Sequence, residues 1–119
     1  MPWVTAGAVC CALAIVAGAF GAHGLKSRLD SAELELWETA ARYLIYGGFG
    51  LVLLGLASNA LGRPLGSAGF SLLIGSAVFS GTVFALALGG PRWLGAITPI
   101  GGALMILGFV LFALAAWRG

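Results

Sequence analysis

The stretch AFGAHGLKSRLDSAELELWETAAR, residues 19–42, separates the first apolar run of this 119-residue chain from the second. It holds the single histidine, all four acidic residues and three of the six basic residues of the sequence. Nearly every other residue is apolar or small. Any chemistry that uses ionisable groups is therefore confined to this stretch and to three isolated arginines, Arg63, Arg92 and Arg118.

The composition is that of a membrane protein. Hydrophobic residues make up 61% of the chain and charged residues 8%, whereas about a quarter of the residues in a soluble protein are charged. The charged residues leave four uncharged runs, and each is long enough to cross a hydrocarbon core of about 30 Å. We therefore predict an all-α integral membrane four-helix bundle that forms a single domain over residues 1–119, with helices at about 3–22, 31–58, 65–88 and 94–117.

The first run ends in small residues around Ala17 to Ala22, as a signal peptide does. A secretory signal begins with a positively charged region, and this chain has no lysine or arginine before Lys26. We interpret the run as a helix of the mature protein. With four crossings both termini share a side with Arg63, and the count of two basic residues there against four on the other side places the termini outside.

The second helix has an amphipathic N-terminal extension. Asp30 and Glu33 have the spacing of a capping box, which predicts a helix start near Ser31. At 100° per residue one side of the first turns is polar and carries Glu35, Glu38, Thr39, Arg42 and Tyr46. The helix would be longer than one bilayer crossing. Its first turns must therefore lie in the interface, stand above it, or bury their polar side against another part of the protein.

Small and hydroxyl residues mark the expected helix contacts. Ala14, Gly18 and Ala22 recur every four residues, a spacing that lets two helix backbones approach closely in lipid. Ser76 and Ser80 share one face of the third helix, where their hydroxyls can bond a carbonyl of their own helix or of another.

The fourth helix contains an ambiguity at Thr98 and Pro99. Either Thr98 caps a helix that begins at Pro99, or a helix that begins near Trp93 contains the proline. In both cases the backbone around Gly95 to Gly102, which includes Gly101, is less regular than its surroundings. Irregular backbone within a membrane must be covered by protein or water, so we expect this segment to face the bundle.

Four motifs carry a family resemblance: AFGAHGL (19–25), ETAARYLIY (38–46), FSGTVFALAL (79–88) and RWLGAITPIGG (92–102). Through them the chain resembles the family catalogued as domain of unknown function 423, which is similar to the transmembrane protein 256 group. The resemblance implies a four-helix protein of the bacterial inner membrane with no agreed activity. Many members have a histidine directly after the second tyrosine, where this chain has Gly47.

His23 is the first candidate functional residue. A neutral imidazole can bind a metal, a quinone or a proton, or it can simply bond the end of its own helix. A lone histidine without a second histidine or a nearby cysteine is a weak metal site, so we predict no metal and no cofactor. The acidic side chains of Glu33, Glu35 and Glu38 either bind a cation or relay protons, or they form the solvated side of an interfacial helix. Adjacent Cys10 and Cys11 point about 100° apart and suit apolar packing.

Topology brings a set of polar residues to one membrane face. The first and third connections lie on the same side of a four-crossing bundle, which predicts a cluster of His23, Glu38, Arg42, Tyr46 and Arg92. Such a cluster either locks the connections together or binds a lipid headgroup or small anion through its two arginines.

We therefore expect a non-catalytic accessory or packing subunit of a larger membrane assembly, whose partners are the bilayer and other membrane subunits or further copies of itself. The alternative is an oligomeric transporter, channel or lipid-binding protein for a small solute, a proton or a headgroup. An interfacial enzyme has the least support, because no nucleophile, metal-ligand or phosphate-binding motif is present. A nucleic-acid partner would require a basic stripe that the chain lacks.

Overall fold

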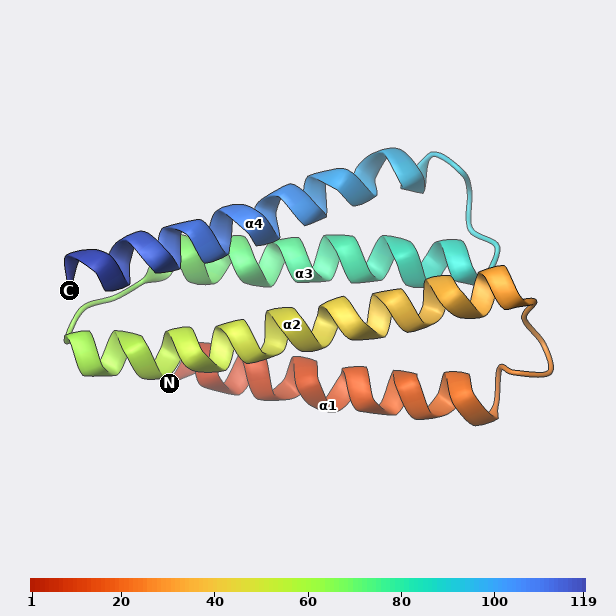
Figure 1. The fold of residues 1–119 in the computed structure, drawn as a ribbon, viewed down its shortest axis with the longest axis horizontal. Coiled ribbons are helices and arrows are strands. Elements are labelled where there is room, and N and C mark those ends of the chain that lie inside the picture. Colours follow the sequence, from red (N-terminus) through yellow and green to blue (C-terminus); the bar gives the residue numbers. More distant parts are fainter.

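The computed structural model describes all 119 residues and contains four helices. These are α1 (Pro2–His23), α2 (Ser31–Leu61), α3 (Gly66–Ala87) and α4 (Leu94–Arg118). Each helix is long and apolar enough to cross a membrane. Both termini and the α2–α3 turn lie at one end of the molecule, and the α1–α2 and α3–α4 connections lie at the other (Figure 1). The predicted all-α, four-helix architecture is confirmed.

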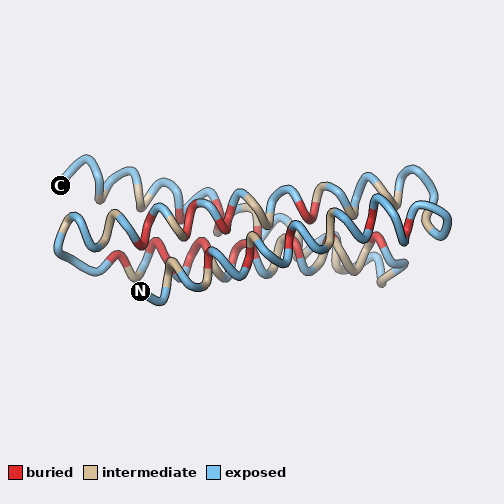
Figure 2. Tube along the Cα trace, turned by 90° about the horizontal axis from the view of Figure 1, so that it is seen from below, coloured by how far each residue is buried: buried red, intermediate tan, exposed pale blue.

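The four helices lie side by side in chain order. Almost all tertiary contacts join consecutive helices, α2 touches α4 and α1 touches α3 only marginally, and α1 does not contact α4. The Cα trace measures 49 × 27 × 18 Å. The buried residues accordingly run along the seams between neighbouring helices (Figure 2). The helices form an open layer, and α4 has a single substantial neighbour.

Glycines allow the consecutive helices to approach at backbone distance. A Cβ atom added to Gly75 of α3 would lie 2.6 Å from the backbone nitrogen of Met105 in α4. One added to Gly7 of α1 would lie 2.5 Å from the carbonyl oxygen of Gly48 in α2. Lipid is as apolar as leucine, so dispersion contacts at such close approaches are a main source of helix association.

Both ends of α2 follow from local sequence. Asp30 accepts a hydrogen bond from the Glu33 backbone at 2.8 Å, and the Glu33 side chain accepts one from the Asp30 backbone at 3.0 Å, which completes the predicted capping box. At the other end Gly62 adopts φ 68°, a left-handed conformation that stops the helix after Leu61. The 31 residues of α2 extend about 46 Å, well beyond a hydrocarbon core of about 30 Å.

Trp37 anchors the first turns of α2 between its two neighbours. Its indole nitrogen donates a hydrogen bond of 2.7 Å to the carbonyl oxygen of Ala17 in α1. Its ring centroid lies 4.6 Å from that of Phe84 in α3 and 6.5 Å from that of Phe20 in α1. The apolar side of these turns is thus packed against α1 and α3, whereas Glu35 and Glu38 are exposed.

The ambiguity in the fourth helix is resolved in favour of a helix that contains its proline. The helix α4 begins at Leu94 and continues through Pro99. The hydroxyl of Thr98 donates to the Leu94 carbonyl at 3.0 Å and is hydrogen-bonded at 2.7 Å to the hydroxyl of Thr82 in α3. Since Pro99 lacks an N–H, the carbonyl of Gly95 has no helical partner there.

The two buried serines of the α2–α3 seam provide a matched test of hydrogen bonding. The Ser80 hydroxyl donates to the Ala40 carbonyl at 2.9 Å, whereas the Ser76 hydroxyl is fully buried without a partner. Because a buried bond contributes about 1 kcal/mol and an unpaired hydroxyl costs free energy, we expect Ser80→Ala to lower the free energy of unfolding by about 1 kcal/mol. Ser76→Ala should leave it unchanged or raise it. Equilibrium unfolding in mixed micelles measures both, and an equal loss in the two variants would contradict the assignment.

Candidate functional site

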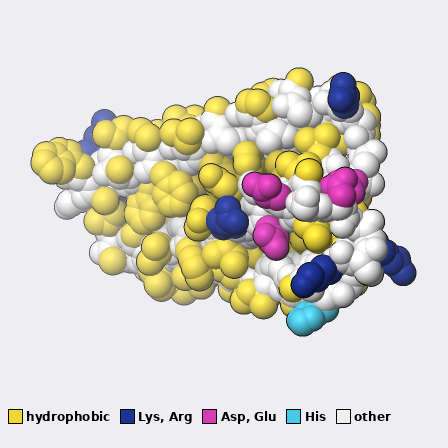
Figure 3. Space-filling view, turned by 45° about the vertical axis from the view of Figure 1, so that its right-hand side comes forward, with side chains coloured by type: hydrophobic (Ala, Val, Ile, Leu, Met, Phe, Trp, Pro, Cys, Tyr) yellow, Lys and Arg dark blue, Asp and Glu magenta, His cyan; other side chains and the backbone are white.

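All charged side chains except those of Arg63 and Arg118 lie in the half of the molecule that carries the α1–α2 and α3–α4 connections. Figure 3 shows acidic, basic and histidine side chains together at this end, with the surface beyond them largely hydrophobic. His23 is the last residue of α1, Arg92 lies in the connection before α4, and Glu38 and Arg42 lie in the first part of α2. The fold therefore brings the predicted polar residues to the same half of the molecule.

The side chains of these residues form no hydrogen bonds with one another. His23, Glu38, Arg42, Tyr46 and Arg92 are all exposed. The side-chain hydrogen bonds of the structure are made by other residues. No group of three or more histidine, cysteine, aspartate or glutamate side chains converges to hold a metal ion. The polar groups at this end are therefore available to a ligand or partner.

Arg42 lies farther along the bundle from the connections than the other charged residues of this end. The ring of the adjacent Tyr43 packs on that of Phe79 in α3, with centroids 4.8 Å apart, and the Ser80 hydroxyl bonds the carbonyl of Ala40. Arg42 is thus level with residues 79–80 of α3. The remaining seven residues of that helix, 81–87, extend about 10 Å farther toward the connections. A charge inset among apolar helices is costly and is usually compensated by a partner or by reaching toward the interface.

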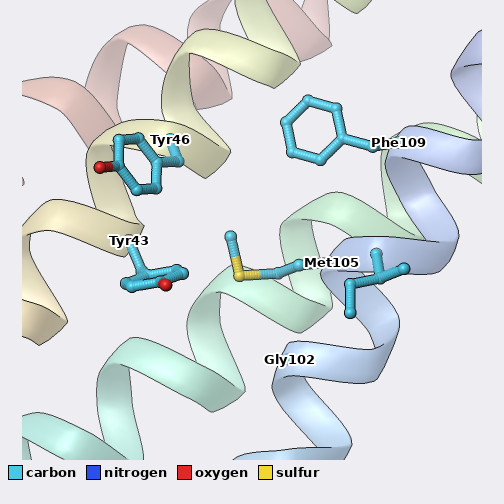
Figure 4. A pocket seen from close by; sticks show the side chains of 6 residues that line it. Tyr43, Tyr46, Gly102, Met105 and Phe109 are labelled. Atoms are coloured by element: carbon cyan, nitrogen blue, oxygen red, sulfur yellow. The ribbon is translucent and has the colours of Figure 1, made fainter.

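An apolar groove adjoins this polar edge. It occupies about 210 Å³ between α2 and α4, and it exists because these helices lie on either side of α3 with little direct contact. Figure 4 shows Tyr43 and Tyr46 of α2 facing Met105 and Phe109 of α4 across it. The two tyrosine rings meet edge to face, with centroids 5.2 Å apart. Its lining consists of Tyr43, Tyr46, Gly102, Met105, Ile106 and Phe109.

Sequence reasoning identified Tyr46 and Gly102 but not the groove that they line. Tyr43 and the α4 residues carry no motif that links them, because the groove depends on the placement of α2 and α4 across a third helix. A second apolar groove of about 260 Å³ lies between α1 and α3. It is lined by Cys10, Leu13, Leu44, Leu73, Ala77, Ser80, Gly81 and Phe84.

The contact stripe of α1 differs from the expected one. Ala14 is buried, but no atom lies within 4 Å of a Cβ built on Gly18, and Ala22 is exposed. Gly7, Ala14 and Gly21 are buried instead, at the seven-residue spacing of a helix that follows one neighbour along its length. The physical reason is that α1 packs almost only on α2. Only one narrow side of α1 is therefore buried.

The expected packing residues of the other helices divide between buried and outward positions. Ser80 and Gly101 are buried between helices, and Gly102 is half-buried at the α2–α4 groove. Thr98 points to α3 through its bond to Thr82, whereas Pro99 is exposed. The segment around Pro99 is therefore covered on one side by α3 and open on the other.

Comparison with known proteins assigns the chain to a family. The family model described as "Protein of unknown function (DUF423)" matches residues 17–102. Similar proteins include UPF0382 membrane proteins of Staphylococcus haemolyticus, at 39% identity, and Staphylococcus epidermidis, at 42%. Each alignment covers 98% of this chain and 95% of the relative. No solved structure is significantly similar. Together with its four spanning helices, these relatives show that the chain is a multi-pass integral membrane protein.

Proposed function

Because this chain belongs to the DUF423 family of proteins of unknown function, we propose a function from its geometry: it is a non-catalytic accessory subunit of a larger membrane assembly. Its partners in this proposal are other membrane subunits. The observation that carries the proposal is the open layer of helices, in which each outer helix is packed on one side only.

The outer helix α4 is the least covered of the four. In the most apolar 18-residue segment of α4, 17% is buried inside the protein, against 39% in the corresponding segment of α2. Exposed apolar side chains follow its outer side at alternating spacings of four and three residues, which is the pattern of a helix-packing seam. They are Ala103, Leu107, Val110 and Leu114. A helix with one neighbour in its own chain gains contacts if another subunit supplies a second neighbour.

The two grooves give little support to transport. Their lining is apolar apart from the hydroxyls of Tyr43, Tyr46 and Ser80 and the thiol of Cys10. A pathway for a proton or polar solute requires polar groups through the membrane. The accessory role is therefore the better-supported of the two functions.

Isolation of the protein from its own membranes in mild detergent, followed by native mass determination, tests the proposal. We expect a complex of fixed stoichiometry with at least one other membrane protein. The double variant Leu107→Ala with Val110→Ala should release that partner, because it removes contact area from the outer side of α4. A matched double variant on α1, Ile15→Ala with Val16→Ala, should retain it. Recovery of the wild-type chain only as a monomer or homo-oligomer would refute the accessory role.

A further inference from the structure

The α2–α4 groove is an open, apolar surface groove of about 210 Å³. It opens to the surroundings of the helices, since Ile106 is 68% exposed and Tyr46 47% exposed. In a bilayer these surroundings include acyl chains. Part of one hydrocarbon chain can therefore lie in the groove.

The polar edge of α2 adjoins the groove. Glu35, Arg42 and Tyr46 lie within about 40° of one another on α2 at 100° per residue, so the polar edge of α2 continues directly into the groove wall. Along this edge, from the membrane interior toward the connections, a tyrosine hydroxyl is followed by a cation and then by carboxylates. Glu38 lies one turn, about 6 Å, beyond Arg42. Neither Arg42 nor Glu38 has a hydrogen-bonding partner among the side chains of the protein.

We propose that this groove and edge bind one zwitterionic phospholipid with a primary ammonium headgroup. One acyl chain lies between Tyr46 and Phe109, the phosphodiester meets Arg42, and the ammonium meets Glu38 with Glu35 nearby. The order of charges on α2 matches the order in such a lipid, whose phosphate is nearer the chains than its ammonium. Arginine binds phosphate oxygens in a charge-assisted, two-pronged contact.

The carboxylates determine the choice of headgroup. An anionic glycerol headgroup would place no cation beside Glu38 and would be repelled by it. A trimethylated headgroup has a cation but no N–H to donate, whereas a primary ammonium has three donors. This proposal is independent of the accessory role, since it concerns a lipid and a different face of α4.

Native mass spectrometry of the purified, delipidated protein reconstituted with defined lipids tests the proposal. With equimolar phosphatidylethanolamine and phosphatidylglycerol, we expect one retained phosphatidylethanolamine per chain. Arg42→Gln should reduce its retention at least about tenfold, which corresponds to the loss of one hydrogen-bonded charge contact. Glu38→Gln should reduce the preference over phosphatidylglycerol. Arg28→Gln, which removes a charge from the same end of the molecule, should change neither.

A variant on the opposite wall makes the test independent of the charges. Ile106→Trp fills the groove from α4 and should also remove the bound lipid, while the thermal unfolding midpoint without lipid remains that of the wild type. Equal retention of phosphatidylglycerol and phosphatidylethanolamine by the wild type would overturn the headgroup assignment. Retention unchanged by both Arg42→Gln and Ile106→Trp would overturn the site.

Discussion

Replacement of Gly101 by alanine should separate α3 from α4. A Cβ atom at position 101 would overlap the backbone nitrogen of Phe79 and lie 2.8 Å from its Cα. Both atoms belong to helix backbone, so no side-chain rotation can relieve the overlap and the helices must move apart. Because overpacking of a well-packed contact costs about 1–3 kcal/mol, we expect Gly101→Ala to lower the free energy of unfolding by about 2–3 kcal/mol. Equilibrium unfolding in mixed micelles measures the loss.

The neighbouring glycine provides the control for this experiment. A Cβ at Gly102 would lie 3.6 Å from the ring of Phe79, which is an ordinary contact distance. Gly102→Ala adds the same methyl group and has the same effect on helix propensity, and we expect its effect on stability to stay within about 0.5 kcal/mol. If Gly101→Ala and Gly102→Ala unfold at the same denaturant concentration, the close approach of α3 and α4 at Gly101 is not the contact that holds them.

Replacement of Trp37 by alanine should loosen three helices at once. The substitution removes the hydrogen bond to the Ala17 carbonyl and the ring contacts with Phe84 and Phe20. It also removes the indole that lies against Gly21 of α1. Truncation of a packed tryptophan costs about 3–5 kcal/mol, and since Trp37 is only half-buried we expect about 3 kcal/mol. The same unfolding measurement reports this loss.

Two further variants separate the contributions of Trp37. Trp37→Phe keeps an aromatic ring but lacks the N–H donor, so it should recover part of the loss and leave a deficit of about 1 kcal/mol from the missing bond. Trp117 is 89% exposed at the end of α4, and Trp117→Ala should have little effect. A Trp37→Ala protein as stable as Trp117→Ala would show that the first turns of α2 are not anchored between α1 and α3.

The open layer accounts for both proposals made for this protein. Helices that lie in a row leave the outer side of α4 uncovered, which is where a partner subunit gains contact area. They also leave a narrow space between α2 and α4 above α3, which accepts a lipid chain. A closed arrangement with α1 packed on α4 would have removed at least the first of these surfaces.

Much of the fold was predictable because membrane insertion follows from local composition. The expected helices at 3–22, 31–58, 65–88 and 94–117 differ from the observed bounds by three residues at most, at Leu61. The start of α2 followed from its capping box, which uses only neighbouring residues. Four crossings also require the first and third connections to share a side, which brings all charged residues except Arg63 and Arg118 to one end.

Other features depend on how the helices pack. The sequence by itself determined the number of spans, their ends and the placement of most charged residues at one end, since each follows from the solvation of a segment by lipid or water. Only the tertiary structure decided that the helices form an open row, that α1 packs through Gly7 and Gly21 rather than Gly18, and that Tyr43 faces Phe109 across a groove. Beyond the polar first turns of α2, every face of these helices is apolar, so hydropathy cannot distinguish one face from another. Close steric fit between particular small and large side chains makes that choice.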